Sequence, residues 1–254
     1  MLLAIDIGNT NVVLGVFDGE KLVENWRVGT NTRITPDEYA IIFKDLFNFA
    51  TLDFKQIAGV IISTVVPPLL PVMTEMSRKY FHIEPMVVTH KLKTGIMIRC
   101  DNPKEVGADR IVNAAAAYQL YGGPLIIVDF GTATTFCAVT QSGDYLGGAI
   151  CPGIKISAEA LFQRASKLPR VELIKPGNVI GTDTVSAMQA GIIYGYAGLV
   201  DGIVERMKKE LSDHATVVAT GGLAELVSPE TRCIRQVKPQ LTLEGLRLLF
   251  EINR

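Results

Sequence analysis

The pattern of apolar and polar residues repeats about halfway along the chain. An apolar run that ends in Asp, followed by Gly and short polar residues, covers Leu2–Asn11 and returns at Leu125–Thr134, so Asp6 and Asp129 are 123 positions apart (129 − 6 = 123). A second apolar run and a Gly turn follow each copy. Gly lets the backbone turn tightly and approach a ligand closely. The pattern predicts two β-hairpins of one design, whose loops face each other and whose Asp residues approach a common point.

The rest of the chain mixes strands and helices. Apolar residues at helical spacing indicate helices, and short apolar runs bounded by Gly or Pro indicate strands. Thr35-Pro36-Asp37-Glu38 is typical of a helix start, with a hydroxyl cap followed by Pro and acids. Besides the hairpins, the expected strands are Lys21–Val28, Gly59–Ser63, Pro85–Val88 and Ala215–Thr220, and the expected helices are Tyr39–Phe49, Leu69–Tyr80, Gly107–Tyr121, Ile156–Ala165, Thr182–Leu211, Leu223–Val227 and Leu243–Glu251. We expect two related α/β domains, residues 1–117 and 118–254, with a cleft between them.

Composition narrows the class of protein. Apolar residues make up 48% of the 254 and charged residues 20%, which is ordinary for a soluble protein with a substantial core. Lys and Arg number 25 against 26 for Asp and Glu, so no basic field is available to attract nucleic acid or an anionic membrane. No uninterrupted apolar run approaches the roughly 20 residues that span a bilayer. We therefore expect a cytoplasmic protein without a nucleic-acid or membrane partner.

Cysteine and histidine give no sign of a metal site of their own. Metal sites built from these residues show characteristic close spacings, which this chain lacks. The residues concerned are Cys100, Cys137, Cys151, Cys233, His82, His90 and His214. The cysteines are most simply interpreted as reduced thiols.

The first hairpin loop is a candidate phosphate-binding loop. Asn9, Thr10 and Asn11 offer hydrogen-bond donors, while the ionised Asp6 only accepts and suits a hydrated magnesium ion. Taken alone, this loop would be better interpreted as a polar hairpin turn with an Asp at its rim. The second Asp-x-Gly loop at Asp129 makes that alternative improbable, because two such loops at equivalent places are unlikely to arise by chance.

A third motif, Ala219–Ala224, contains Thr-Gly-Gly at the end of a predicted strand. Bare backbone of this kind can lie against a flat ligand or its ribose, although Gly-Gly by itself is also an ordinary turn signal. The order of the three motifs resembles the actin, sugar-kinase and heat-shock-chaperone ATPase superfamily, which has duplicated ribonuclease H-like domains.

More closely, the chain resembles the type III pantothenate kinase family over nearly its whole length. Glu105–Arg110 is the most specific part of the resemblance. The segments that carry it are Asp6–Asn11, Ser63–Pro67, Asn102–Arg110, Asp129–Thr134, Gly147–Gly153, Leu168-Pro169 and Gly181–Thr184. The resemblance implies transfer of the γ-phosphoryl group of ATP to the primary 4'-hydroxyl of pantothenate, the first step of coenzyme A biosynthesis.

The resemblance also implies a role for individual residues. Asp109 would be the base that orients the acceptor hydroxyl and takes its proton, with plain helix capping as the competing interpretation. The implied ATP-binding residues are Asp6, Ile7, Gly8, Asn9, Thr10, Asn11, Val12, Val13 and Thr132; the substrate-binding residues are Cys100, Gly107, Ala108, Asp109, Arg110 and Thr184; the metal ligands are Asp129 for a monovalent cation and Asp6 for magnesium. The cation, K⁺ or NH₄⁺, would supply positive charge that neither loop carries as Lys or Arg.

Some implications stay open at this level. At Cys100 the family pattern calls for an aromatic residue, usually Tyr. Thr184 could contact pantothenate, in its own or a neighbouring subunit, or could cap a helix. Together with the apolar segment Gly191–Tyr196, which could instead be core, Thr184 suggests a homodimer. Two other functions compete: a small-alcohol or sugar kinase of the same superfamily, and a non-enzymatic transcription accessory factor, which has also been described in the family.

Overall fold

A computed structural model describes residues 1–89 and 91–254 and divides them into two compact units. Unit 1 contains Met1–Gly95, Asn102–Ala116 and Thr242–Arg254, and unit 2 contains Ile96–Asp101 and Ala117–Leu241. His90 lies outside the described residues. Each unit is built on one sheet and is described by itself.

The sheet of unit 1 has the strand order β3-β2-β1-β4-β5. Its strands are β1 (Leu2–Ile7), β2 (Asn11–Asp18), β3 (Lys21–Gly29), β4 (Gly59–Thr64) and β5 (Met86–Val87). The first three strands form an antiparallel meander, and β4 and β5 add parallel to β1. Parallel neighbours need a crossover connection, and helices provide it here.

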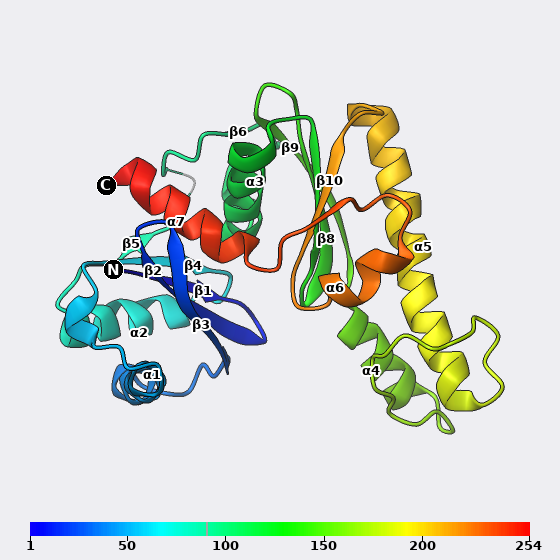
Figure 1. The fold of residues 1–254 in the computed structure, drawn as a ribbon, viewed down its shortest axis with the longest axis horizontal. Coiled ribbons are helices and arrows are strands. Elements are labelled where there is room, and N and C mark those ends of the chain that lie inside the picture. Colours follow the sequence, from blue (N-terminus) through cyan, green and yellow to red (C-terminus); the bar gives the residue numbers. More distant parts are fainter. Residues whose placement is uncertain (90) are drawn as a thin grey trace. The chain divides into compact units, whose positions relative to one another are not determined.

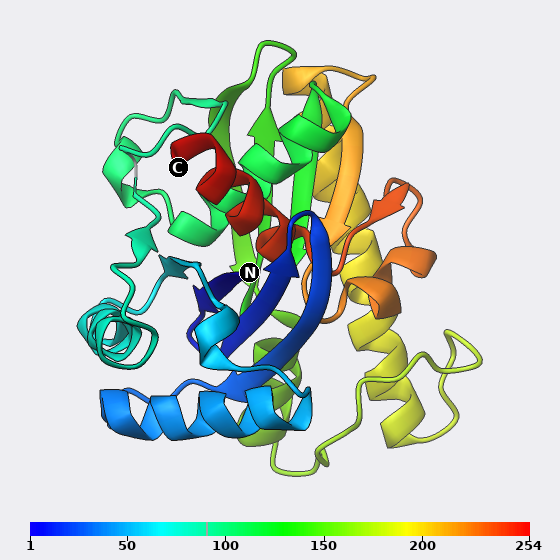
Figure 2. The ribbon, with the colours of Figure 1, turned by 60° about the vertical axis from the view of Figure 1, so that its left-hand side comes forward.

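Both faces of this sheet are covered by helices. One face packs against α1 (Pro36–Phe49) and α2 (Leu69–Met76), and its core includes Ile5, Phe43 and Met73. The predicted cap is present, because Thr35 and Glu38 form a capping box at the start of α1. The other face receives α7 (Leu241–Asn253), drawn in red beside the blue strands in Figure 2. Side chains of α7 press on two strand glycines, since a Cβ at Gly59 would lie 2.3 Å from Phe250 and one at Gly15 2.9 Å from Leu243.

The sheet of unit 2 has the order β11-β10-β7-β8-β9-β6. Its strands are β6 (Met97–Ile98), β7 (Leu125–Phe130), β8 (Ala133–Val139), β9 (Asp144–Pro152), β10 (Thr216–Thr220) and β11 (Gln236–Val237). The helices of the unit are α4 (Ile154–Arg164), α5 (Thr184–Leu211) and α6 (Ala224–Val227), as labelled in Figure 1. The core on one face joins strand residues such as Val128 and Phe136 to Ile192 and Val200 of α5.

The two sheets share one topology, and this confirms the duplication. Strands β7, β8, β9, β10 and β11 pair with one another in the same senses as β1, β2, β3, β4 and β5. Even an irregularity recurs, because the register shifts after Val16 where β2 pairs with β3 and after Ala138 where β8 pairs with β9. The copies differ in loop length: Gly8–Thr10 separates β1 from β2, whereas only Gly131 and Thr132 separate β7 from β8.

Strand β9 was not among the expected elements, and it contains Gly147 and Gly148. Both glycines lie inside the strand at positive φ. Their function is close approach rather than reversal: a Cβ at Gly148 would lie 1.7 Å from the carbonyl oxygen of Phe136 on β8. Glycine in a strand often marks such a contact or a bulge.

The sequence predicted domains 1–117 and 118–254, and two segments of the chain lie in the other unit from the one that this prediction gave them. The observed division at 116/117 is one residue away from the expected one. Residues 96–101, however, join unit 2 because β6 pairs with β9, and residues 242–254 join unit 1 because α7 covers its sheet. The helix that contributes the expected Ala-rich stretch, α3 (Ala108–Tyr121), crosses the division.

The longest helix, α5, is long and apolar enough to span a membrane by length and composition alone. However, 56% of its most apolar window is buried inside the structure. Its buried residues, including Ile193 and Val200, pack in the core of unit 2. The helix therefore has the character of a core helix of a globular unit.

Candidate active site

The first hairpin loop turns its carbonyl oxygens toward the protein. The Gly8 N–H donates to the Asn11 carbonyl at 2.9 Å. Thr30, just beyond β3, donates its hydroxyl to the Gly8 carbonyl at 2.6 Å and its N–H to the Thr10 carbonyl at 3.0 Å. Asn9 and Thr10 are exposed. With these acceptors already bonded, the loop can present its donors to an anion such as phosphate.

Asp6 lies at the end of β1, on the sheet face opposite the α1–α2 core. Its neighbour in register on β4 is Ser63, and neighbours on parallel strands direct their side chains to the same face. The Val65 N–H then bonds the Ile7 carbonyl at 3.0 Å, which holds the ends of the two strands together. This edge of the sheet thus carries one carboxylate and one hydroxyl side by side.

Asp109 belongs to the same part of unit 1. It is the second residue of α3, and its Oδ1 accepts the Arg110 N–H at 2.8 Å. The carboxyl rests against Gly107, where a Cβ would lie 2.5 Å from Oδ1 and 3.6 Å from Val65. A side chain at position 107 would therefore displace the carboxyl, which explains the Gly of the Glu105–Arg110 segment.

The environment of Asp109 changes its acidity. Burial raises the pKa of the Asp109 carboxyl above its ordinary value, and the hydrogen bond and positive charge of Arg110 only partly oppose this effect. A raised pKa makes the carboxylate a stronger base. Asp109 does accept a hydrogen bond from a first-turn N–H, as the capping interpretation requires. A capping role does not, however, require burial that disfavours the ionised form of the carboxyl.

The second hairpin loop is reinforced by a helix start. The Gly131 N–H donates to the Ala133 carbonyl at 3.1 Å. Gly153, which caps α4, packs so closely on the loop that a Cβ there would lie 2.0 Å from the Thr132 carbonyl oxygen. Thr132 itself is exposed. The positive end of the α4 dipole therefore lies beside the loop, which favours a bound anion.

Asp129 connects this loop to the Thr-Gly-Gly turn. A Cβ at Gly221 would lie 2.5 Å from the Asp129 Oδ1, and one at Gly131 would lie 3.5 Å from it. Gly221 has φ +93°, a conformation that side chains rarely adopt. In register, Asp129 lies next to Thr220 on β10 and Thr135 on β8. The structure thus brings the second and third sequence motifs together around one carboxylate.

Cys100 lies in unit 2, two residues after the end of β6. The Arg99 N–H donates to the Tyr145 carbonyl at 2.9 Å, which anchors this segment to β9. The Cys100 Sγ lies 3.6 Å from where a Cβ of Gly147 would be. A bulkier residue at position 100 would occupy the space beside Gly147, whereas the smaller Cys100 thiol leaves part of that space open.

Thr184 is not a helix cap. Asp183 is the N-cap of α5 and forms a capping box with Ser186, so the Thr184 hydroxyl is not needed for that purpose. Thr184 is exposed and lines an apolar groove of about 930 Å³ between α4 and α5. The groove is lined by Ser157, Ala160, Leu161, Arg164, Leu168, Thr184, Ala187, Met188, Gly191, Ile192 and Tyr196.

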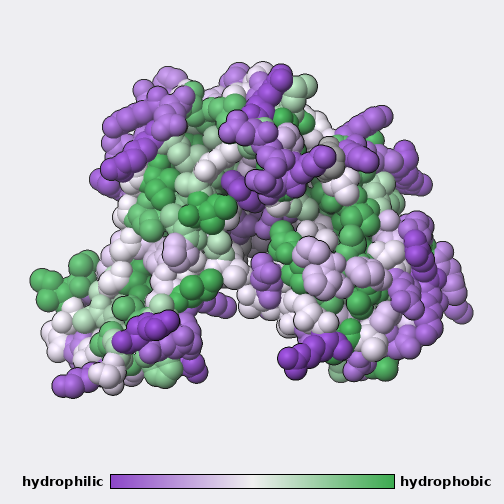
Figure 3. Space-filling view, turned by 180° about the vertical axis from the view of Figure 1, so that it is seen from behind, coloured by the Kyte–Doolittle hydropathy of each residue, from purple (hydrophilic) through white to green (hydrophobic). Residues whose placement is uncertain are grey.

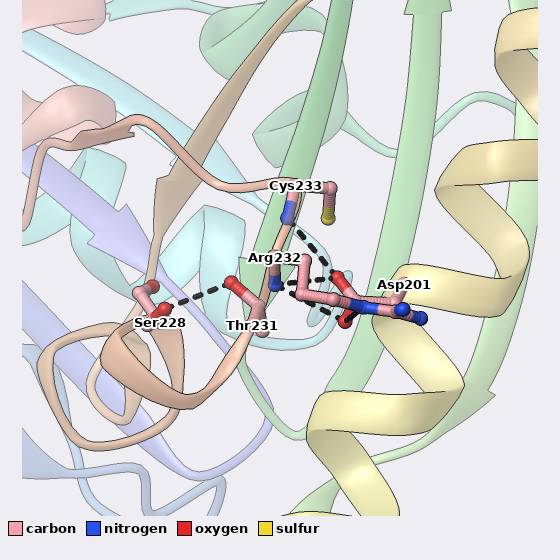
Figure 4. Close-up of polar contacts among 5 residues, drawn as sticks. All are labelled: Asp201, Ser228, Thr231, Arg232 and Cys233. Atoms are coloured by element: carbon pink, nitrogen blue, oxygen red, sulfur yellow. Dashed lines mark hydrogen bonds and ion pairs between the residues drawn. The ribbon is translucent and has the colours of Figure 1, made fainter.

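The segment that follows the Thr-Gly-Gly turn is fastened to α5 by one carboxylate (Figure 4). Asp201 accepts the Arg232 N–H at 2.9 Å, the Cys233 N–H at 3.1 Å and the Arg232 Nε–H at 3.2 Å. Burial alone would raise the pKa of Asp201, but the hydrogen bonds from Cys233 and Arg232 outweigh it and the pKa is lowered. Burial and the Asp201 charge raise the pKa of the Cys233 thiol to about 12, which makes this thiol unreactive.

The sequence patterns did not identify two kinds of residue that the structure places in or near these sites. Asp201 gave no signal because its partners are about thirty positions away, and the neighbours of the loop aspartates become visible only in the sheet register. The described residues also hold no group of three or more His, Cys, Asp or Glu side chains that could cage a metal ion. A magnesium ion at Asp6 would then keep waters or substrate oxygens, as this ion commonly does.

Comparison with known proteins identifies this arrangement. A family profile described as Type III pantothenate kinase matches residues 2–206. The chain belongs to the type III pantothenate kinase family. Full-length relatives of that description, from Geobacter sulfurreducens and Moorella thermoacetica, are 59% and 56% identical, and each alignment covers 100% of both chains. The chain is accordingly an enzyme, an ATP-dependent kinase of pantothenate in coenzyme A biosynthesis.

Solved structures share the fold of this pantothenate kinase at low identity. A protein described as a putative Baf family transcriptional activator from Campylobacter jejuni superposes with a TM-score of 0.61 at 17% identity, covering 98% of this chain and 97% of its own. An inorganic polyphosphate/ATP-glucomannokinase from Arthrobacter gives 0.52 at 15%, covering 100% and 99%. These likenesses confirm the expected fold of duplicated ribonuclease H-like domains and, at such identities, nothing more.

Proposed function

We propose that Asp109 is the general base with which this chain transfers the γ-phosphoryl group of ATP to the 4'-hydroxyl of pantothenate. The observation that carries the proposal is the buried Asp109 carboxyl, held against Gly107 with a raised pKa. A base near the acceptor hydroxyl receives its proton as the phosphoryl group moves, and most of its work is orientation. Cys100, Gly107, Ala108 and Arg110 complete the pantothenate-binding surface.

ATP is held by Asp6 through Val13, with Thr132 as a further contact. The bonded carbonyls of the first loop and the α4 start beside Thr132 both favour a polyphosphate. The Asp6 carboxylate is a suitable hard-oxygen ligand for Mg²⁺, whose charge, when it is bound, would offset that of the phosphates.

Asp129 is the ligand of a monovalent cation, K⁺ or NH₄⁺. Its carboxylate lies against bare backbone at Gly221 and beside the buried hydroxyl of Thr220. One carboxylate with neutral oxygens around it is a donor set for a weakly hydrated cation rather than for a transition metal. The cation would add positive charge that the side chains of both loops lack.

The chain is a cytoplasmic homodimer, with the α4–α5 groove as the surface that a second copy covers. The groove is apolar and contains Thr184, which would then contact pantothenate at its own or the partner's site. Hydrophobic surface gathers over this part of unit 2 at the lower left of Figure 3, and Val179 and Ile180 are 66% and 84% exposed. Exposed apolar residues that lie together on a surface mark an interaction site more often than apolar residues scattered singly. Light scattering should give about twice the chain mass of 27.6 kDa; a monomer would contradict the dimer.

One assay tests the reaction and its cofactors together. Purified protein is given pantothenate, ATP, Mg²⁺ and K⁺, and each component is omitted in turn. We expect product only when pantothenate, ATP and Mg²⁺ are present, and a rate with Na⁺ alone far below that with K⁺ or NH₄⁺. An acceptor panel of sugars and small alcohols replaces pantothenate in parallel, and faster turnover of any of them would identify a different kinase. ATP turnover that ignores pantothenate would instead favour a regulatory protein.

A further inference from the structure

Several side chains in the described part of the chain bury a polar atom that has no hydrogen-bond partner. A buried hydroxyl without a partner costs free energy, and native structures keep few of them. The residues are Ser63, Tyr121, Thr134, Thr220, Ser228 and Arg247. Two of these, Ser63 and Thr220, share a feature that the others lack.

Ser63 and Thr220 occupy the same position in the two duplicated sheets. Ser63 on β4 is in register with Asp6, and Thr220 on β10 is in register with Asp129. In each pair the strands are parallel, so the hydroxyl and the carboxylate project from the same face as direct neighbours. Ser63 is 0% and Thr220 1% exposed.

This correspondence is invisible in the sequence. The two aspartates are 123 positions apart, but Ser63 and Thr220 are 157 apart (220 − 63 = 157), so no single alignment offset relates both pairs. Different crossover lengths separate β1 from β4 and β7 from β10. The sheet register alone reveals that each loop aspartate has a buried hydroxyl beside it.

Thr134 provides an internal comparison. Its hydroxyl is also buried and unpartnered among the described residues, but it is in register with Phe130, which belongs to the core face of the sheet. Asp129 and Thr220 lie on the opposite face. If the protein merely tolerates unpartnered hydroxyls, replacing Thr134 and replacing Thr220 should have the same effect. If the Thr220 hydroxyl binds a ligand, only the replacement of Thr220 should affect ligand binding.

We propose that Thr220 and Ser63 each complete the cation site of the aspartate beside them, an inference that rests on the proposed roles of Asp129 and Asp6. A hydroxyl oxygen is a hard, neutral ligand, so it adds a donor without adding negative charge. Thr220 serves as an oxygen ligand of the monovalent cation. Ser63 bonds a water of the hydrated magnesium ion, which orients that ion as outer-shell groups commonly do.

The decisive experiment compares Thr220→Val with Thr134→Val. Thermal unfolding is followed as KCl replaces NaCl at constant ionic strength, with Mg²⁺ and a non-hydrolysable ATP analogue present. We expect K⁺ to raise the melting temperature of the wild type and of Thr134→Val at the same half-saturating concentration. Thr220→Val should need roughly tenfold more K⁺, the effect of losing one ligand group. In NaCl both variants should be at least as stable as the wild type, because each loses an unpartnered hydroxyl.

The outcomes separate this inference from the function on which it rests. An unchanged K⁺ midpoint in Thr220→Val would overturn the role of Thr220 while leaving the Asp129 site intact. A wild type that melts identically in KCl and NaCl would overturn the Asp129 site, and the role of Thr220 with it.

A second arm tests Ser63 with Mn²⁺ in place of Mg²⁺, measured by electron paramagnetic resonance with the same ATP analogue. Ser63→Ala should weaken Mn²⁺ binding roughly tenfold, as outer-shell substitutions do. Ser228→Ala removes another buried, unpartnered hydroxyl that has no loop carboxylate in register, and its Mn²⁺ affinity should match the wild type. Equal Mn²⁺ binding by Ser63→Ala and Ser228→Ala would overturn the role of Ser63.

Discussion

Asp109 in unit 1 and Asp201 in unit 2 are both withdrawn from solvent, yet their surroundings change their acidity in opposite directions. Burial raises the pKa of Asp109, where the backbone N–H groups of Arg110 and Asp109 and the Arg110 charge oppose it incompletely. Burial also acts to raise the pKa of Asp201, but hydrogen bonds from the Cys233 thiol, the Arg232 guanidinium and two backbone N–H groups outweigh it and lower the pKa. The additional side-chain donors of Arg232 and Cys233 at Asp201 distinguish the two sites.

This difference separates chemistry from architecture. A carboxylate that few protein donors satisfy retains the capacity to accept a proton from a substrate. A carboxylate that is fully engaged by the backbone fixes a loop and has little left to offer a ligand. We therefore expect substitution of Asp109 to affect the reaction and substitution of Asp201 to affect folding.

The largest expected effect comes from Asp109→Asn. Loss of a general base should lower kcat by roughly 10²–10⁴. Steady-state kinetics with pantothenate measures it, and circular dichroism checks the fold. The matched control is Asp37→Asn, because Asp37 is likewise the second residue of its helix but is exposed and has a lowered pKa. Full activity in Asp109→Asn, or an equal loss in both variants, would contradict the assignment.

A smaller effect, on stability, is expected for Asp201→Ala. It leaves the Arg232 and Cys233 N–H groups without their acceptor, at a cost of roughly 1–3 kcal/mol in the free energy of unfolding. Urea denaturation measures the loss. Asp201→Asn keeps one acceptor oxygen and should lose less. If both variants unfold at the same urea concentration as the wild type, the hydrogen bonds to Asp201 contribute nothing to stability.

The smallest effect is the pH dependence, which should have opposite signs at the two positions. The folded pKa of Asp201 is lowered, so its contribution is present above the unfolded value of about 3.9 and is lost as the pH falls through the folded pKa. The loss in the free energy of unfolding caused by Asp201→Asn should therefore become smaller as the pH falls. The folded pKa of Asp109 is raised, so its contribution is present below the unfolded value and is lost as the pH rises through the folded pKa.

Asp109→Asn should accordingly gain stability relative to the wild type as the pH increases from 4 to 7. Urea midpoints from about pH 2 to pH 7 test both signs, because the Asp201 contribution is lost only below the unfolded value of about 3.9. Parallel curves for the two variants would mean that their carboxyls share one environment, contrary to the structure.

Local signals made most of the fold predictable. The capping box at Thr35, the Gly-bounded strands and the repeated Asp-x-Gly hairpins each depend on residues close in sequence. No strand was expected where β9 lies, and Gly147 and Gly148 within it serve close packing against β8. Glycine has several uses, and only the contacts decide among them.

The candidate site, like the fold, could be predicted only in part. The loops at Asp6 and Asp129 and the Glu105–Arg110 segment could be predicted because their chemistry is written in consecutive residues. The contact between Asp129 and Gly221, and the register that pairs Thr220 with Asp129, could not, since both join positions about ninety residues apart. Distances along the chain carry no information on such pairs until strand order is known.

The division of the chain into units has a practical consequence for dissecting this enzyme. The polypeptide passes from one unit to the other four times, at 95/96, 101/102, 116/117 and 241/242. Neither half-gene, cut at the centre of the repeat, would encode a self-sufficient piece. The amino-terminal fragment would lack the helix that shields its sheet, and the carboxy-terminal fragment would lack an edge strand. Separate production of either lobe requires grafting these short segments back onto it.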